Sequence, residues 1–346
     1  MKTNDVLPAP NIGYFFAHKL NFIAETLTKN NVSIDALLKS TNIDKEDLSD
    51  REYKITNNQI ITFYRNTLAL KIPALSLLLG GAIKANDYGL YGCTLLCCKG
   101  LLSSLAFSVR YHNLTTKTVN MSLITNDSSD FSSFRFEDTL HAPDLVEFNI
   151  ELQCAIVLSL VRECLDDKYF SFEALKLTCK KPKHAHLYQK HFSCPIHYEQ
   201  PHNEFILNSK DLLLSTPRSN PFAIPLLLDQ CDSVLNSIAT KNEFLIMVNQ
   251  WIAANMHNDI CAESLAGYLC ITPRTLRRKL SSQGTSFREI IKELRTSAAK
   301  KLIKETQLTI EDIAYSVGFN DVSNFRAAFK KWTGDTPSEM RKRFTH

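Results

Sequence analysis

Two stretches near the C-terminal end of the chain share one pattern of apolar and polar positions. The first runs from Asp259 to Gly284 and the second from Thr309 to Gly334, and each indicates a short helix, a tight turn and a second helix that ends at a glycine. Between them, residues 286–304 contain neither glycine nor proline and carry apolar side chains at helical spacing, which predicts one long helix. The pattern therefore predicts an all-α domain with two helix-turn-helix units joined by a long helix.

The residues before these units follow a different pattern. Helical spacing predicts helices over residues 14–29, 33–39, 56–70, 74–80, 91–98, 101–111, 145–165 and 184–192. Alternation and short apolar runs predict strands over residues 118–124, 131–136, 173–179, 196–198 and 204–207. Three prolines, Pro217, Pro221 and Pro225, then interrupt the chain before helices expected at 222–239 and 242–255. We expect an α+β domain at 1–218, a linker at 219–241 and the helical domain at 242–346.

The second helix of each helix-turn-helix unit is expected to have one apolar and one polar face. In the first unit, Thr272 is suited to cap the helix, Pro273 suits its first turn, and Leu276 and Leu280 would pack inward. In the second unit the cap pair Thr309 and Asp312, the turn residue Gly318, and an apolar stripe are expected at corresponding places. That stripe comprises Phe325, Ala328, Phe329 and Trp332.

The outer faces of these helices carry candidate nucleic-acid chemistry. Arg274, Arg277 and Arg278 share the outer face of the first helix, whereas Ser323, Arg326, Ala327 and Lys330 lie outward on the second. Basic side chains neutralise DNA phosphates, and arginine also pairs with guanine in the major groove. The pattern favours DNA binding over the alternative, in which these are ordinary amphipathic helices of an all-α core.

A set of residues in the second unit resembles the C-terminal signature of AraC/XylS-type transcription regulators. The matching residues are Ala314, Gly318-Phe319, Ser323, Phe325, Phe329-Lys330, Gly334, Thr336-Pro337 and Arg341. The resemblance implies base-contacting roles for Arg274, Arg277, Arg278, Val322, Ser323 and Ala327. The family often has arginine where Ala327 stands, and here an arginine stands one residue earlier, so Arg326 joins the candidates. Thr272, Ser281, Asn324, Lys330 and Lys331 are expected to contact the DNA backbone.

The N-terminal region resembles, over residues 14–220, the arabinose-binding-like sensor domain of such regulators. The matching residues are Tyr88-Gly89, Gly92, Leu105, Arg110, Tyr111, the run from Leu175 to Phe192, Cys194-Pro195, Asn203 and Leu213. The resemblance implies binding of a small effector, or dimerisation, without identifying the effector. Conceivable polar groups of an effector pocket are Tyr88, Tyr91, Lys99, Arg110 and His112. A leucine-rich region of neutral to acidic charge would tolerate an apolar or fatty-acid-like ligand.

Basic and acidic residues are distributed unevenly between the two regions. The whole chain has a net charge of only +4, but the residues from Glu243 onward carry 16 basic and 11 acidic side chains, whereas the rest carries 24 and 25. The basic excess therefore lies in the candidate DNA-binding domain. Ten cysteines without a Cys-x-x-Cys pair suit a reducing cytoplasm. We see no signal peptide, and charges within 145–165 argue against a membrane span.

Two other kinds of chemistry were weighed against this interpretation. A metal site could use residues of one histidine- and cysteine-rich run, namely His184, His186, His191, Cys194, His197 and His202, but structural roles are favoured and no metal is expected. A DNA-targeted alkyl-acceptor or thiol enzyme could use Cys97 or Cys98. These cysteines and Cys93 lie among leucines, which favours buried packing over reactivity.

The sequence thus predicts a cytoplasmic, sequence-specific transcription regulator that is not an enzyme and needs no cofactor. Its expected partners are double-stranded promoter DNA, a small effector, RNA polymerase and a second copy of the chain. The resemblance favours activation of transcription.

Overall fold

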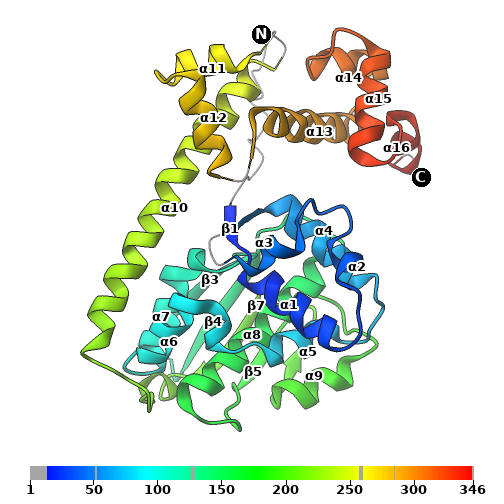
Figure 1. Cartoon of the computed structure of the whole chain (residues 1–346). Helices are drawn as coiled ribbons and strands as arrows, with labels where there is room; N and C mark the ends of the chain where they lie inside the picture. The colour runs from blue at the N-terminus through cyan, green and yellow to red at the C-terminus, as the bar shows by residue number, and fades with distance from the viewer. Residues whose placement is uncertain (1–13, 51–52, 126–128, 257–259, 284, 345–346) are drawn as a thin grey trace. The chain divides into compact units, whose positions relative to one another are not determined.

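The computed structural model describes residues 14–50, 53–125, 129–256, 260–283 and 285–344 (Figure 1). These residues form two compact units, one over Tyr14–Ile238 and one from Ala239 onward. The first unit combines helices with a sheet, and the second contains only helices among its described residues. The predicted fold class, an α+β domain followed by an all-α domain, is confirmed.

A five-stranded sheet forms one layer of the first unit. Its strands are β3 (Val119–Ile124), β4 (Phe131–Asp138), β5 (Ala174–Lys176), β6 (Ile196–His197) and β7 (Asn203–Asn208). Their order is β3-β4-β7-β5-β6, and every pair is antiparallel except β5 and β6. Phe134 of β4 lies opposite Phe205 of β7, and both side chains are fully buried. All five strands were predicted, and their ends differ from the predicted ends by at most three residues.

The long helix α8 (Val146–Leu165) forms the centre of the first unit. Fifteen of its twenty residues are buried, and it packs against α5 (Leu75–Ala82). Gly80 permits this close approach, because an added Cβ would lie 2.6 Å from the Cβ of Ala155. The remaining helices are α1 (His18–Lys29), α2 (Ile34–Leu38), α3 (Lys45–Ser49), α4 (Asn57–Leu68), η1 (Ala85–Tyr88), α6 (Gly89–Cys97), α7 (Leu101–Tyr111), η2 (His112–Leu114), α9 (Ala185–Phe192) and η3 (Asp211–Leu213).

The first three residues of the helix expected at 14–29 form a strand instead. β1 (Tyr14–Phe16) pairs antiparallel with β2 (Lys54–Thr56), and α1 begins only at His18. The Lys54 ammonium lies 2.7 Å from the centroid of the Phe16 ring. Because this pairing joins segments almost forty residues apart, local helical spacing could not reveal it. The short helix α3 was also absent from the sequence prediction.

The second unit consists of α11 (Ala262–Tyr268), α12 (Pro273–Ser281), α13 (Phe287–Glu305), α14 (Ile310–Ser316), α15 (Val322–Thr333) and α16 (Pro337–Phe344). The prediction of two helix pairs joined by a long helix is therefore confirmed. α16 was not predicted, although Thr336 accepts a hydrogen bond from the Glu339 backbone N–H, as expected of an N-cap. Within the described ranges, no helix is long and apolar enough to cross a membrane.

One continuous helix, α10 (Ala223–Ala254), replaces the two helices expected at 222–239 and 242–255. It begins in the first unit and continues into the second, so the segment assigned to a linker is helical from Ala223 onward. Pro225 was expected to interrupt the chain. It lies in the first turn of α10, where a missing N–H leaves no hydrogen bond unmade.

Candidate nucleic-acid interface and a buried cavity

The first helix-turn-helix unit is held together by a cap, a turn and two leucines. The Thr272 hydroxyl accepts a hydrogen bond from the Thr275 backbone N–H at 3.1 Å, and Pro273 is the first residue of α12. Cys270 forms the turn with φ of +53°, a conformation that glycine more often supplies. Leu276 and Leu280 are buried, as predicted. Gly284, expected to end this unit, lies outside the described residues.

The second helix-turn-helix unit repeats this arrangement with different side chains. Thr309 and Asp312 form the predicted capping box at the start of α14. Gly318 takes φ of +80°, and a Cβ there would lie 2.0 Å from the Met256 carbonyl oxygen. Phe325 and Phe329 are fully buried, while the other two residues of the expected stripe, Ala328 and Trp332, are half-buried. Gly334 ends α15 with φ of +84°.

The outward faces of α12 and α15 expose every predicted DNA-contacting side chain except that of Val322, which is half-buried. The exposed residues are Thr272, Arg274, Arg277, Arg278, Ser281, Ser323, Asn324, Arg326, Ala327, Lys330 and Lys331. Neither helix contains an acidic residue. Among the described residues, no carboxylate forms an ion pair with Arg274, Arg277, Arg278 or Arg326. These guanidinium groups are thus presented without an internal counter-charge.

The two second helices differ at several outward positions, among them Arg274, which corresponds to Ser323 when the N-caps are aligned. When the N-caps Thr272 and Asp321 are aligned, Arg277 corresponds to Arg326, and Arg278 corresponds to Ala327. The side-chain carboxylate of Asp321 accepts a hydrogen bond from the Asn324 backbone N–H at 2.7 Å. α12 therefore presents three outward arginines, whereas α15 presents one.

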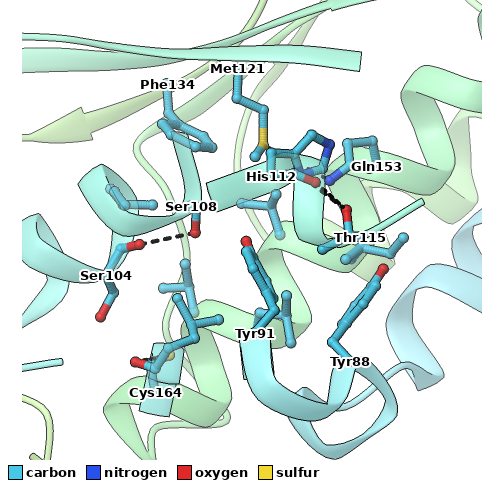
Figure 2. A pocket seen from close by; sticks show the side chains of 16 residues that line it. Tyr88, Tyr91, Ser104, Ser108, His112, Thr115, Met121, Phe134, Gln153 and Cys164 are labelled. Atoms are coloured by element: carbon cyan, nitrogen blue, oxygen red, sulfur yellow. Dashed lines mark hydrogen bonds between the residues drawn. The ribbon is translucent and has the colours of Figure 1, made fainter. Parts of the chain in front are cut away.

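A narrow cavity lies inside the first unit, between the sheet and three helices (Figure 2). Its walls come from η1, α6, α7, η2, α8, β3 and β4 and from the loop residue Thr115, and most lining side chains are apolar or aromatic. Its volume is about 20 Å³, close to the space needed for one water molecule. Three of the five residues suggested for an effector pocket, Tyr88, Tyr91 and His112, line this cavity.

The other two suggested residues, Lys99 and Arg110, do not line this cavity. The Arg110 guanidinium is exposed and lies 3.1 Å from a carboxylate oxygen of Asp232. Lys99 is exposed at the start of the turn before α7. Each residue was chosen for being a polar neighbour in the sequence, but the helical geometry of α7 turns Arg110 away from the side that Ser104 and Ser108 present to the cavity.

One end of the cavity is polar, and two of its residues were missed by sequence analysis. Gln153 of α8 lines it, and the Lys19 ammonium of α1 lies behind Gln153, donating to its Oε1 at 3.2 Å. Lys19 also donates to the Thr118 hydroxyl at 3.2 Å. Both residues are almost fully buried. A signal existed for Lys19, since it stands on the apolar face of α1 four residues before Ile23.

Burial disfavours the charged form of both basic groups at this end. It lowers the pKa of Lys19 to about 7. Burial, with smaller contributions from the nearby charges of Lys19 and Lys117, holds the pKa of His112 well below its usual range. His112 Nδ1 lies 3.4 Å from the Thr115 hydroxyl, and Nε2 has no hydrogen-bond partner among the described residues. Nor does any described carboxylate form an ion pair with Lys19.

The first half of α10 is anchored to the helices that line this cavity. The Tyr111 hydroxyl, at the end of α7, donates to a carboxylate oxygen of Asp232 at 2.8 Å. The Cys231 sulfur lies 3.4 Å from the Thr94 hydroxyl of α6. Cys231 is fully buried. A displacement of α6 or α7 would therefore act directly on α10.

The histidine- and cysteine-rich run does not gather at one point. Of its members only His184 joins a group of possible metal ligands, together with Glu147 and Glu151 of α8, whose ligand atoms all lie within 4.8 Å of one another. The hydroxyls of Ser76 and Tyr188 already donate hydrogen bonds to Glu151. Burial, above all, raises the pKa of Glu151 to about 7. Hydrogen bonding and protonation thus account for this carboxyl, and the absence of a metal stays a prediction.

The cysteines considered for thiol chemistry differ in their surroundings. Cys98 is buried, and burial raises the pKa of its thiol to about 11. Cys93 is exposed and Cys97 is half-buried. All ten cysteines are free thiols. Because the thiolate is the nucleophile, a raised pKa disfavours reaction at Cys98.

Comparison with known proteins connects the two units to established domain types. A model described as the arabinose-binding domain of AraC transcription regulator matches residues 32–215, and a helix-turn-helix domain model matches residues 265–343. The chain is 29% identical over 274 residues to the ornithine utilization regulator of Pseudomonas aeruginosa, which covers 78% of this chain and 79% of that protein.

Two further proteins resemble the chain over nearly its whole length. An uncharacterized HTH-type transcriptional regulator of Mycobacterium tuberculosis is 26% identical over 347 residues, covering 97% of this chain and 99% of that protein. The crystal structure of transcriptional regulator CdpR from Pseudomonas aeruginosa has a TM-score of 0.50 and 20% identity, covering 94% of this chain and 98% of that one. The second likeness concerns the fold alone.

Proposed function

The chain belongs to the AraC family of transcription regulators, since the arabinose-binding-domain model covers more than half of its length, and we propose that it activates promoters under the control of a small ligand. Like its relatives it is a DNA-binding transcription regulator with an N-terminal ligand-binding domain. The observation that carries the proposal is the pair of acid-free outward faces on α12 and α15, where exposed arginines lack an internal counter-charge.

DNA recognition is assigned mainly to α12. Arg274, Arg277 and Arg278 would reach base edges in the major groove, and Thr272 and Ser281 would contact phosphates. α15 would hold a second groove through Val322, Ser323, Arg326 and Ala327, with Asn324, Lys330 and Lys331 on the backbone. The nineteen residues of α13 span about 28 Å at 1.5 Å per residue, near the roughly 34 Å between successive groove faces. Because Ala327 replaces an arginine, we expect α12 to supply more of the sequence discrimination.

Ligand control is assigned to the cavity and to α10. A ligand can change DNA binding only if its affinity differs between two arrangements of the protein. A ligand that spreads the walls of the cavity would displace α6 and α7, to which Cys231 and Asp232 anchor α10. α10 continues into the DNA-binding unit, so it offers a continuous path between the two sites.

The remaining parts of the proposal rest on family membership and composition. Regulators of this kind act beside RNA polymerase, and a symmetric dimer on repeated sites is the common solution for helix-turn-helix proteins. Ten free thiols suit the reducing cytoplasm. We propose no enzymatic role, since burial disfavours the thiolate of Cys98.

Capture of genomic DNA fragments by the purified full-length protein at physiological salt tests this function. We expect a small set of fragments that share a motif. Arg277→Ala should lose that motif, and Lys210→Ala, an exposed change in the other unit, should retain it. Uniform, salt-sensitive capture by the unaltered protein, or an intact motif with Arg277→Ala, would contradict the assignment of base reading to α12.

A further inference from the structure

The cavity of the first unit combines apolar walls with a polar end that has unused hydrogen-bonding capacity. Its walls include Leu105, Phe134 and Val157, whereas the polar end is formed by His112, Gln153 and Thr115. Figure 2 shows the Tyr88 and Tyr91 hydroxyls directed toward this polar end, with Met121 beside Gln153. A ligand that matches this arrangement has one polar group and one apolar body.

The amide of Gln153 is oriented by the lysine behind it. Lys19 Nζ donates to Gln153 Oε1 at 3.2 Å, so the Gln153 Nε2 group is the one turned toward the cavity. The contact recorded for Nε2 is a 4.0 Å approach to the sulfur of Met121, which is a weak acceptor. Two N–H donors of a side chain that is only 3% exposed are therefore available to a ligand.

Charge at this end favours an anion. Lys19 and His112 are 1% and 5% exposed, and the further charged neighbour, Lys117, is also basic. No described carboxylate forms an ion pair with Lys19. Buried charged groups are normally paired, so an entering anion would supply the partner that the protein itself does not provide.

We propose that this polar end binds the carboxylate of a straight-chain monocarboxylate, through Gln153 Nε2 and His112 Nε2, with Lys19 as the counter-charge behind them. Binding raises the protonation of Lys19 or His112, and the resulting positive charge compensates that of the carboxylate; the proton comes from solvent. The unbranched body lies between α7 and α8. A dianion would need more cationic groups than this end offers, and a polyol would leave its hydroxyls against apolar walls.

The narrowness of the cavity selects the shape of the body. A volume of about 20 Å³ requires lining side chains to move before any ligand body enters. A flexible alkyl chain demands smaller displacements than a planar ring, and the unbranched Met121 can change rotamer easily. The proposal rests on the proposed role of this unit as the ligand-binding part, and it adds the class of ligand.

Isothermal titration of the full-length protein with octanoate tests the proposal. Octanoate should bind saturably, and 1-octanol, which has the same chain without the charge, should bind at least about tenfold more weakly. Titrations at pH 8 in two buffers of different ionisation enthalpy should reveal net proton uptake. Equal binding of octanol and octanoate, the lack of proton uptake, or no binding of millimolar octanoate would each overturn the proposal.

A substitution at Gln153 separates this role from a purely structural one. Gln153→Glu places a carboxylate beside Lys19, so it should raise the melting temperature of the free protein and abolish octanoate binding. Gln189→Leu, at an exposed glutamine of α9, should change neither. Octanoate binding that survives Gln153→Glu would contradict the site. DNA capture by the same preparations distinguishes failure of the proposed ligand class from failure of the proposed regulator function. A shared motif without octanoate binding would contradict the ligand class and leave the regulator function supported.

Discussion

At the scale of single residues, Lys19 has the most unusual environment in the first unit. It is fully enclosed, donates to Thr118 and Gln153, and has no acidic partner among the described residues. Its burial must therefore cost free energy whenever the group is charged. That cost is tolerable in a sensor, because a bound anion can recover it.

Lys19→Met should alter the pH dependence of stability. Burial lowers the pKa of Lys19 to about 7 in the folded state, whereas the unfolded chain keeps its usual value of 10.5. Between these values the unfolded chain binds more protons, so this group makes the folded state more stable as pH rises. The unfolding free energy of the unaltered protein minus that of Lys19→Met should therefore increase by at most about 1.4 kcal/mol per pH unit from pH 7 to 9.

Denaturant unfolding at pH 7, 8 and 9 measures this difference. Lys29→Met, at the exposed end of the same helix, serves as the matched control and should follow the unaltered protein. Parallel pH curves for Lys19→Met and the unaltered protein would refute the buried, partly uncharged lysine.

Lys330→Ala should weaken DNA binding without changing specificity. Its exposed ammonium on α15 suits a phosphate contact, which is independent of base sequence. Binding measured over a range of salt concentrations should lose about one unit of the log–log salt slope on both the specific site and unrelated DNA. A selective loss at the specific site would instead assign Lys330 to base reading.

At the scale of elements, the turn before α15 places the strictest limit on side-chain size in the second helix-turn-helix unit. Gly318 has a positive φ, and a Cβ added to it would lie only 2.0 Å from the Met256 carbonyl oxygen. A side chain at that position forces both backbone strain and a displacement of the chain after α10. The equivalent turn of the first helix-turn-helix unit contains Cys270, whose φ is +53°.

Gly318→Ala should destabilise the DNA-binding unit by about 1–3 kcal/mol. Gly267→Ala is the matched control, because a Cβ there meets nothing within 4 Å. Since Gly267 lies inside α11, alanine should leave stability unchanged or increase it by up to about 1 kcal/mol. Chemical denaturation of both full-length variants compares them directly, and equal unfolding free energies would show that the turn can relax.

Asp232→Ala should weaken the link between ligand and DNA without removing either site. It removes the acceptor for the Tyr111 hydroxyl and the partner of Arg110, so α10 loses its polar anchor on α7. The ratio of DNA affinities with and without ligand should move toward one, while ligand affinity changes less. Asp229→Ala, three residues earlier and exposed, should leave the ratio unchanged. An unchanged ratio for both variants would mean that coupling does not pass through this anchor.

Local pattern was enough to predict most elements and some of the chemistry. Leu276, Leu280, Phe325 and Phe329 were recognised as inward-facing because helical spacing alone determines their face. β1 and β2 were missed because their pairing depends on a distant partner rather than on their own residues. The continuity of α10 was missed because Pro225 was expected to break the helix. In the first turn of a helix, proline leaves no hydrogen bond unmade.

At the scale of the whole molecule, the cavity shows why a ligand site is harder to predict than a DNA-binding face. Its residues come from seven helices and strands and one loop, spread between Tyr88 and Cys164, and Lys19 of α1 donates to one of them, Gln153. The candidate base-contacting arginines of α12, in contrast, lie within two turns of one helix, so their shared face follows from spacing. Tyr88, Tyr91 and His112 line the cavity, whereas Arg110 and Lys99, suggested by the same reasoning, do not.

Removal of metal should leave the whole protein unaffected. Hydroxyl donors and a raised pKa account for the buried Glu151 carboxyl, so the Glu147, Glu151 and His184 group needs no cation. Incubation with EDTA should not change the melting temperature, and elemental analysis should find no stoichiometric zinc. A lower melting temperature after chelation, restored by zinc, would identify this group as a metal site.

For the proposed ligand, the small volume of the cavity also predicts how fast the protein responds. A ligand body enters only after α7, α8 and their side chains have moved apart, so opening precedes binding. At high ligand concentration the observed association rate then levels off at the rate of opening, however much ligand is added. The delay before a transcriptional response is then limited by this internal motion, so we expect a pulse of ligand shorter than the opening time to give no signal.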